Sequence, residues 1–184
     1  MTPPGFPDAA IIAARDAAKA YLRITLDDED AVIGGFAATA LAMAEAFCDR
    51  VLIRRDFTAI LGARRGWQRL PSGPVSAIGT VQGLPADGAA FDLPVDAYAI
   101  DIDAAGEGWV RVTDPGAAGR VQVNYSAGVA ADWNALPAPV AQGVVRLIAH
   151  LHGERDGAMA APPAAVTALW RPFRRVRLAE AARC

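Results

Sequence analysis

Apolar residues recur at helical spacing over the first 48 residues of the chain. Residues 8–22 form one such stretch, in which Asp8 is a suitable N-cap. A second helix is predicted to start at the acidic cluster Asp27–Asp30, because carboxylates stabilise the free N–H groups of a first helical turn. This helix extends to Cys48, and its broad apolar face indicates either the centre of a bundle or a helix that partly faces another subunit. The stripe assigned to a subunit interface consists of Val32, Phe36, Met43 and Phe47.

Between residues 51 and 126 the pattern changes to short β-rich segments separated by glycine and proline. Tyr98, Ile100 and Ile102 alternate with small or polar residues, and the same alternation recurs over 120–125. Such alternation predicts strands with one buried face. The segment is therefore expected to form five or six short antiparallel strands, arranged as a small sheet or sandwich. The expected strands are 57–61, 67–70, 75–81, 98–102, 109–113 and 120–125.

Helical spacing returns at Pro137, which suits the first turn of a helix. The apolar residues that follow fall at i, i+4, i+7, i+8 and i+11, which is the clearest amphipathic pattern in the chain. Gly153 or Gly157 suits the end of this helix. After a proline-containing connector, residues 164–170 are predicted to form two more helical turns.

Together these elements predict an α+β fold. Two N-terminal helices and one long C-terminal helix would form a small helical bundle, with an inserted antiparallel β-sheet or sandwich and a C-terminal basic arm. The expected parts are an N-terminal helical part at 1–50, a β-rich insertion at 51–134, a third helix completing the helical core at 135–160, and a short helix with the arm at 161–184.

Composition limits the classes of function. The formal net charge of −2 argues against a domain that is basic throughout and binds nucleic acid by that charge alone. The charge is uneven, because residues 171–184 contain five arginines and one glutamate, which leaves an acidic body. The apolar run over 31–48 is nearly long enough to span a membrane, but its alanine content suits a soluble helix better. Without a signal peptide at residues 1–8, Cys48 and Cys184 are expected to be reduced thiols in the cytoplasm.

The polar residues suggest no convincing catalytic or metal site. His150 and His152 point about 200° apart on a helix, so they cannot share a metal and are expected at the surface or an interface. Asp101 and Asp103 share a strand face and could form an acid–base pair or a Ca²⁺ site, although solvated side chains on the outside of a sheet explain them better. Cys48, inside an apolar helix, is expected to be a small buried hydrophobe. No enzyme activity, cofactor or metal is predicted.

The C-terminal arm is the strongest local feature, because it mixes guanidinium groups with aromatic and aliphatic side chains. Arginine can bind phosphates, and Trp and Arg also anchor protein interfaces. A binder of phosphates alone would not need the apolar residues, so docking to a protein is favoured over nucleic acid; a solvated tail is the plain alternative. The residues assigned to docking are Trp170, Arg171, Phe173, Arg174, Arg175, Val176, Arg177 and Leu178.

Several short motifs occur in a characteristic order along almost the whole chain. Ala17–Ile24 is a Lys-containing helix end with Leu-Arg, and it is followed by the acidic helix start. The others are Ala44–Arg50 before the first strand, Leu70–Val75 of the Leu-Pro-x-x-Pro-Val type, Val123–Gly128 followed by Leu136 and Pro137, and the closing Leu169–Leu178. In order and spacing these motifs resemble the head–tail connector, or adaptor, proteins of long-tailed phages and gene transfer agents.

This resemblance implies a dodecameric ring bound beneath the portal protein of a DNA-filled capsid. The C-terminal segment would dock on the portal, and the other side would receive a stopper or tail terminator protein. DNA would only pass through the channel, and an acidic body suits this because a negative lumen lets the duplex slide. Such a protein is assembled in the bacterial cytoplasm and is found in the neck of a virion or phage-like particle, without catalysis, cofactor or membrane.

Two other classes of function stay open from the residues themselves. The first is a nucleic-acid-binding accessory protein that uses the Arg-rich tail. The second is a small-molecule enzyme that uses Asp101 and Asp103, which would require a concave pocket beside their strand.

Overall fold

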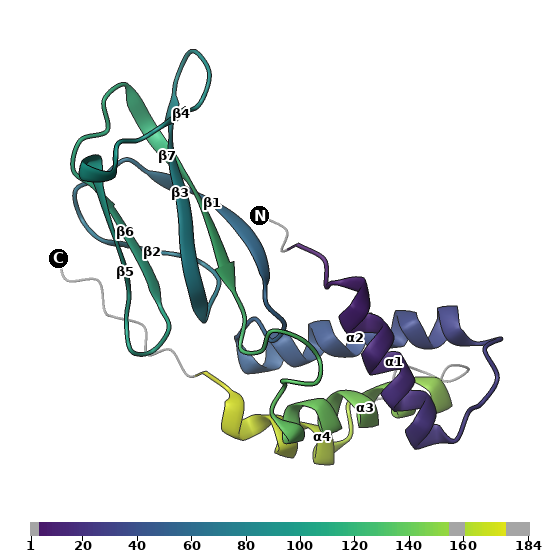
Figure 1. Ribbon diagram of the computed structural model, residues 1–184. Helices are drawn as coiled ribbons and strands as arrows, with labels where there is room; N and C mark the ends of the chain where they lie inside the picture. The colour runs from purple at the N-terminus through teal and green to yellow at the C-terminus, as the bar shows by residue number, and fades with distance from the viewer. Residues whose placement is uncertain (1–3, 155–160, 176–184) are drawn as a thin grey trace. The chain divides into compact units, whose positions relative to one another are not determined.

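The computed structural model describes residues 4–154 and 161–175. The chain divides into two compact units (Figure 1). The β unit consists of Ile53–Ala131 with Met1–Gly5, and the helical unit consists of Phe6–Leu52 with Asp132–Cys184. Helices and antiparallel sheets are both present, so the predicted α+β fold is confirmed.

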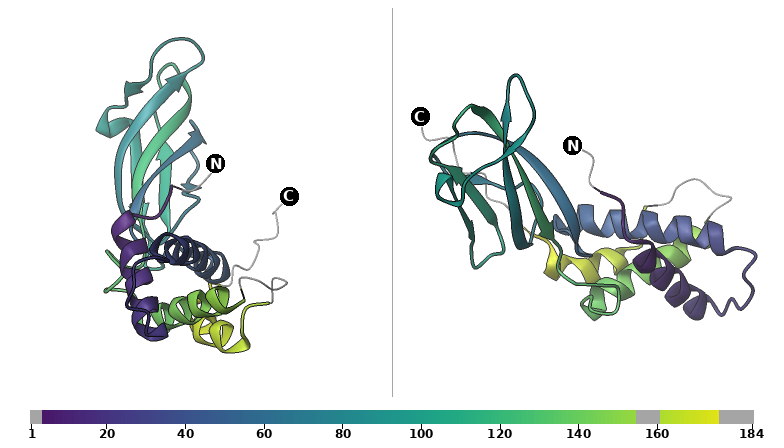
Figure 2. Two further views of the ribbon diagram at one scale, coloured as in Figure 1. Left: turned by 90° about the vertical axis from the view of Figure 1, so that its right-hand side faces the viewer. Right: turned by 45° about the horizontal axis from the view of Figure 1, so that its top comes forward.

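The helical unit is a bundle in which α1, α2 and α3 all contact one another and α3 also contacts α4 (Figure 2). Its core contains many alanines, such as Ala10, Ala14 and Ala18, which are all buried on one face of α1. Small side chains let helix backbones approach closely. The elements are α1 (Asp8–Leu22), α2 (Asp30–Cys48), α3 (Ala138–Gly153), α4 (Ala164–Trp170) and the 3₁₀ turn η2 (Arg171–Phe173).

The starts of the first two helices differ slightly from the sequence expectation. Pro7 occupies the N-cap position of α1, and Asp8 lies in the first helical turn without a side-chain cap. The second helix begins at Asp30, because the preceding acidic residues form the turn that leads into it. Both helices end on a residue in the left-handed conformation, Arg23 and Asp49. A left-handed residue redirects the chain sharply and brings its N–H to the last free carbonyls.

The β unit contains two antiparallel sheets, one with strand order β1-β7-β3-β4 and one with strand order β2-β6-β5 (Figure 1). Buried residues from both sheets, such as Val110 and Val123, form the core of this unit. The strands are β1 (Arg55–Gly62), β2 (Gln68–Arg69), β3 (Val75–Pro85), β4 (Phe91–Asp92), β5 (Tyr98–Ile102), β6 (Gly108–Val112) and β7 (Ala118–Ala127), and the 3₁₀ turn η1 (Val95–Ala97) precedes β5.

The central strand β7 follows the alternation expected from the sequence. Val121, Val123 and Tyr125 are buried, whereas the residues between them are exposed or half-buried. Tyr125 lies opposite Phe57 of β1, and their rings stack with centroids 5.6 Å apart. The side-chain period of two therefore fixes the register of the larger sheet.

Candidate interaction surfaces

Trp170, at the end of α4, fills a slot in the helical unit. Its side chain is 1% exposed, and its indole N–H donates to the Val140 carbonyl at 3.2 Å. Gly143 of α3 makes room for the ring, because a Cβ there would lie 2.2 Å from the indole nitrogen. The ring of Phe47 closes the slot from α2, with centroids 5.9 Å apart. Trp170 therefore ties the end of the chain to the bundle core.

The residues after Trp170 continue along the C-terminal end of α2. The guanidinium group of Arg174 lies 5.7 Å from the centre of the Phe47 ring, within the range of a cation–π contact. The N–H of Arg175 donates to the Cys48 carbonyl at 2.9 Å, which satisfies one of the free carbonyls at the helix end. Residues 170–175 are named the arm anchor below. The arm anchor is thus held against the helical unit at both of its ends.

The structure separates the residues that the sequence assigned to docking. Trp170 is enclosed by its own unit, so in this conformation it is not available to another protein. Arg171 and Arg174 are exposed, and Phe173 and Arg175 are half-buried. Val176, Arg177 and Leu178 lie outside the described residues. The sequence analysis missed that Gly143 makes room for Trp170. The available signal was a glycine on the apolar face of α3.

The residues of the predicted subunit-interface stripe on α2 also differ in their surroundings. Phe47 contacts Trp170 and Arg174 within its own unit. Val32 is 48% exposed, and Phe36 and Met43 are half-buried. The neighbouring stripe of α2 enters the core and consists of Ile33, Ala37, Leu41 and Ala44.

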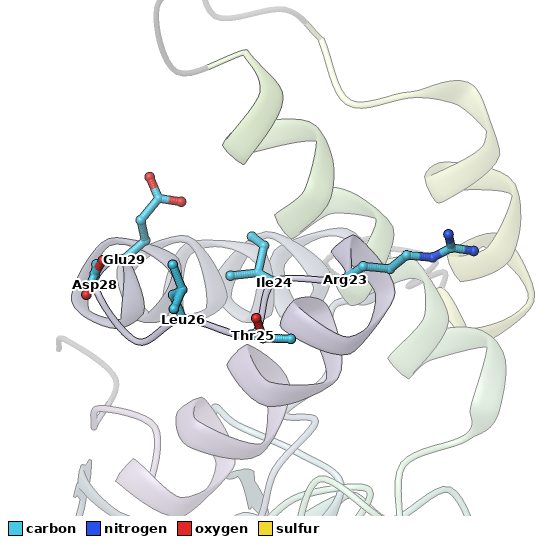
Figure 3. A pocket seen from close by; sticks show the side chains of 6 residues that line it. All are labelled: Arg23, Ile24, Thr25, Leu26, Asp28 and Glu29. Atoms are coloured by element: carbon cyan, nitrogen blue, oxygen red, sulfur yellow. The ribbon is translucent and has the colours of Figure 1, made fainter.

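A surface cavity that the sequence did not indicate lies at the loop between α1 and α2. Its volume is about 520 Å³, and Leu26 beside it is 68% exposed. Figure 3 shows the six lining side chains, which come from one short segment. They include no cysteine or histidine, and the cavity is a hollow formed by one surface loop. The lining residues are Arg23, Ile24, Thr25, Leu26, Asp28 and Glu29.

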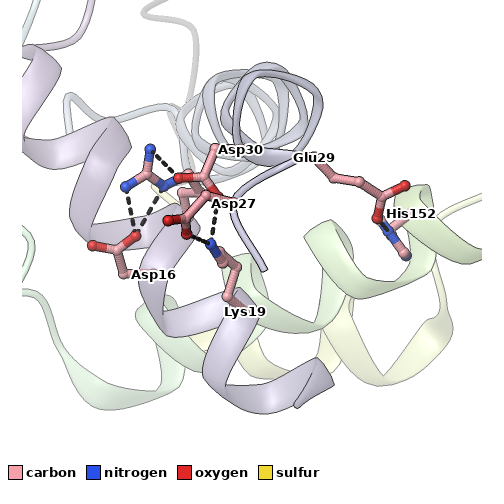
Figure 4. Close-up of polar contacts among 7 residues, drawn as sticks. Asp16, Lys19, Asp27, Glu29, Asp30 and His152 are labelled. Carbon is pink, nitrogen blue, oxygen red and sulfur yellow. Dashed lines mark hydrogen bonds and ion pairs between the residues drawn. The ribbon is translucent and has the colours of Figure 1, made fainter. Parts of the chain in front are cut away.

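Polar contacts hold this loop against two helices (Figure 4). The Lys19 ammonium group, from α1, donates to Asp27 at 2.7 Å and also to Asp30. His152 of α3 meets Glu29, with Nε2 and Oε2 2.9 Å apart. The hydrogen bond to Asp27 is the main reason that the pKa of Lys19 is raised, and the same bond lowers the pKa of Asp27. His152, which was expected at a surface or an interface, thus joins α3 to the loop within the helical unit.

Acid should weaken this loop. Because the pKa of Asp27 is below its ordinary value of 3.8, its bond to Lys19 adds stability above about pH 4 that is lost as the pH falls through the lowered pKa. Lys19 has a raised pKa, so its ammonium group stays charged throughout the acid range. Asp27→Asn is expected to lower the thermal unfolding midpoint at pH 7 and to flatten its fall between about pH 5 and pH 3.

Circular dichroism melts across that pH range would measure the effect. Asp28→Asn removes a carboxylate from the same loop, at a position that is exposed, and is the matched control. Equal pH profiles for the two variants would contradict a structural role for the Lys19–Asp27 contact.

Asp101 and Asp103, which the sequence suggested as a possible pair, have different environments. Asp103 uses its carboxylate within a turn, where Oδ1 accepts from the N–H groups of Ala105 and Glu107 and Oδ2 accepts from the Trp109 indole. Asp101 lies in a shallow groove of about 290 Å³ with Trp67 and Trp109. Among the described residues, no group of three or more His, Cys, Asp or Glu side chains could hold a metal ion. The Asp103 carboxylate is therefore engaged within its turn, whereas Asp101 lies in the groove.

Cys48 is buried at the end of α2, as expected from the sequence. Burial raises the pKa of its thiol to about 11. At neutral pH the sulfur is thus protonated, and a protonated thiol is a poor nucleophile.

Helix α2 is long and apolar enough to cross a membrane by length and composition alone, with a mean hydropathy of 1.7 over an 18-residue window. A third of that window is buried within the protein, and core helices of many folds pass the same test. The composition of α2 is therefore weak support for a membrane span.

Comparison with known proteins finds similar chains in structures of phage-like particles. No family model and no curated protein matches the sequence. A chain in the neck of an empty gene transfer agent (GTA) particle, computed with C6 symmetry, is 29% identical with a TM-score of 0.76, and the match covers 97% of this chain and 96% of that one. The chain is similar to a GTA neck protein over nearly its whole length.

Two further GTA structures contain similar chains. One is the virion of a native particle, with 30% identity, a TM-score of 0.71 and coverage of 95% of this chain and 94% of that one. The other is the neck of a native particle computed with C12 symmetry, with 28% identity, a TM-score of 0.69 and coverage of 97% of both chains. The resemblance found in the sequence is thus confirmed at the level of a phage-like particle neck protein. Cyclic symmetry places copies around one axis, which is the arrangement of a ring.

Proposed function

We propose that this protein is a structural head-to-tail adaptor of a phage-like particle. It forms a ring under the portal, docks to the portal through its C-terminal arm, and joins a stopper or tail terminator on the other side while leaving a channel for DNA. The observation that carries the proposal is the match to a GTA neck chain across 97% of this chain, at 29% identity.

The arm anchor supports the portal-docking step. A segment that must contact a partner pays less ordering entropy if its base is already fixed. Here the base is fixed by the buried Trp170 and by the bond from Arg175 to the end of α2. The exposed guanidinium groups of Arg171 and Arg174 flank that base and would favour an acidic surface on the partner. The docking contacts are therefore assigned to these arginines and to the residues after the anchor.

The charge distribution supports a passive conduit for DNA. Five of the arginines are in the last 14 residues, and the rest of the chain has more acidic than basic residues. A lumen lined with negative charge repels phosphates, so the duplex passes without being held.

Deletion of residues 176–184 tests the docking step. The deletion leaves the arm anchor in place, so the fold should be unchanged by circular dichroism while co-purification with the portal protein is lost. A truncation that removes only residues 179–184 is the matched control, and it should keep binding because Val176, Arg177 and Leu178 remain. Normal portal binding by the longer deletion would overturn the docking assignment.

The same variants separate the adaptor from a nucleic-acid-binding accessory protein. In a gel shift with duplex DNA at about 150 mM salt, a short arginine tail acting alone should bind weakly, because its affinity depends on counterion release. Tight binding to DNA that disappears with residues 176–184 would favour the accessory protein. Absence of the protein from purified particles would refute the adaptor role altogether.

A further inference from the structure

Strand β5 forms one edge of the smaller sheet, because the strand order of that sheet is β2-β6-β5 (Figure 1). In an antiparallel pair, the N–H and C=O groups of successive residues point alternately toward the neighbouring strand and away from it. The Asp103 N–H donates to the carbonyl of Glu107, the residue before β6, so the main-chain groups of Asp103 point toward β6. The main-chain groups of Ile100 and Ile102 have the other parity, so they point outward from the sheet.

This edge lacks the features that commonly protect a free strand. Natural proteins blunt sheet edges with very short strands, with proline or lysine, or with bulges. Strands β2 and β4, which form two other edges, contain only two residues each. Strand β5 contains five residues, none of them proline or lysine, and its register with β6 has no shift. It therefore has outward main-chain groups along a length on which another strand can pair.

The apolar side chains on one face of β5 are only partly covered. Ile100 lies opposite Val110 of β6, which is fully buried, yet Ile100 is 43% exposed and Ile102 is 40% exposed. The two isoleucines share a face because side chains alternate along a strand. A further strand at this edge would cover them if its residues on the same face were apolar.

The opposite face of β5 is acidic and aromatic. Asp101 lies directly across from Trp109, and both line the groove of about 290 Å³ with Trp67. The guanidinium group of Arg111 lies 4.8 Å from the centre of the Trp67 ring and does not pair with Asp101. In the part of the chain that the structure describes, the Asp101 carboxylate has no hydrogen bond or ion pair. A carboxylate beside indole rings is complementary to a cationic side chain, because both attract positive charge.

We infer that β5 is the edge to which an extended segment of the tail-side protein adds as a further strand. The inference rests on the proposed function, which names a stopper or tail terminator as a partner and assigns no surface to it. The portal contact is assigned to the arm of the helical unit, so the tail-side partner needs a different surface.

The two faces of β5 define the chemistry of the added segment. It alternates apolar residues with a lysine or arginine, so that the apolar side chains cover Ile100 and Ile102 and the basic side chain lies opposite Asp101. The β5 strand of a second copy is a poorer occupant. Antiparallel pairing centred on Asp101 would place two carboxylates directly opposite each other, which is destabilising.

Site-specific photo-crosslinking in assembled particles tests the inference. A benzophenone amino acid at Ile102 should give an adduct with the tail-side protein, identified by mass spectrometry. The same group at Ile60 of β1, which is 54% exposed, is the control and should give no adduct with that protein. Adducts of Ile102 only with this chain or with the portal would overturn the inference, and so would the absence of any adduct. Absence of this chain from the particles would instead refute the proposed function.

Charge reversal at Asp101 gives an independent measurement. Asp101→Lys places a cation opposite the basic residue of the partner, so the fraction of particles that carry tails should fall at least about tenfold. This chain should remain on the tailless heads, because its arm is unchanged. Asp87→Lys makes the same change at an exposed aspartate outside β5 and should leave tail attachment normal. Normal attachment with Asp101→Lys, or equal loss of tails with both variants, would overturn the inference.

Proline at position 100 tests the main-chain pairing. Because the Ile100 N–H points away from β6, Ile100→Pro removes a donor from the free edge and no hydrogen bond of the sheet. Tail attachment should again fall at least about tenfold, whereas Ile100→Val keeps the N–H and should attach tails normally. Circular dichroism should show that both purified variants are folded. Equal tail attachment by the two variants would contradict pairing through the main chain.

Discussion

Replacement of Trp170 by alanine is expected to lower the free energy of unfolding of the helical unit by about 3–5 kcal/mol. The indole is almost completely enclosed, and the slot beside Gly143 has the shape of this ring. Alanine would leave a cavity that α2 and α3 cannot close without moving their backbones. It would also remove the hydrogen bond to the Val140 carbonyl and the ring contact with Phe47. Urea unfolding followed by circular dichroism would measure the loss.

Two controls define what the loss means. Trp170→Phe keeps an aromatic ring but removes the N–H donor. It is therefore expected to lower the free energy of unfolding by a smaller amount, about 1–2 kcal/mol. Trp67→Ala makes the same change at a tryptophan that is 45% exposed, and it should cost less than about 1 kcal/mol. If Trp170→Ala were as mild as Trp67→Ala, the arm anchor would not be a structural element of the bundle.

The functional effect of Trp170→Ala follows from the same geometry. Without the indole, the chain from Arg171 onward loses its fixed starting point on α2. Portal binding should weaken even when the protein remains folded at low temperature, because the arm must then be ordered on binding. Such weakening would separate an anchoring role of Trp170 from a direct contact with the portal.

The strongly periodic elements could be predicted from the sequence. The first helix has the predicted bounds of 8–22, and the third begins at Ala138 next to the predicted start, because both have one clear apolar face. Strand β5 also has the predicted bounds of 98–102, but the expected buried face is wrong, because Ile100 and Ile102 are 43% and 40% exposed. Strand β4 was missed, because two residues are too few to show a period.

Burial at the two candidate surfaces could not be predicted, for two physical reasons. Both stripes of α2 are apolar, so periodicity alone does not say which one enters the core, and the structure buries the stripe that contains Ile33 and Leu41. Trp170 lies next to Arg171 in an arginine-rich stretch, which favoured an exposed arm. Its enclosure depends on Gly143, a residue 27 positions earlier in the chain, and local patterns do not show such contacts.

The contact between Lys19 and Asp27 could have been suspected from the sequence. Lys19 is the one lysine of the chain, and it stands eight residues before Asp27. The contact of Glu29 with His152 had no such signal, because it joins residues 123 positions apart.

Two of the motifs that carried the family resemblance meet in the β unit. The Tyr125 hydroxyl accepts a hydrogen bond from the Ser72 N–H at 3.2 Å, and the Gly128 N–H donates to the Pro74 carbonyl at 2.8 Å. The Leu-Pro-Ser-Gly-Pro-Val turn and the end of β7 thus hold each other in place.

Among substitutions that add one methyl group to the β unit, Gly128→Ala is expected to be the most destabilising. It should lower the free energy of unfolding by about 3 kcal/mol. The backbone of Gly128 has φ +155°, in a region that side chains disfavour. Its Cβ would lie 2.4 Å from both the Cα and the N of Arg54, and these backbone atoms cannot rotate away. The Arg54 N–H donates to the Ala130 carbonyl at 2.8 Å. A shift of Arg54 would therefore also break this hydrogen bond, which joins the first and last segments of the β unit.

Gly119→Ala is the matched control, because it adds the same methyl group within β7, the strand that ends one residue before Gly128, at a position where nothing lies within 4 Å. It should change the free energy of unfolding by less than about 1 kcal/mol. Urea titration of both variants would measure the difference, and hydrogen exchange of the β1 and β7 amides would locate it. Similar stabilities for the two variants would show that the junction at Gly128 can relax, and the link between the two motifs would then be looser than the hydrogen bonds indicate.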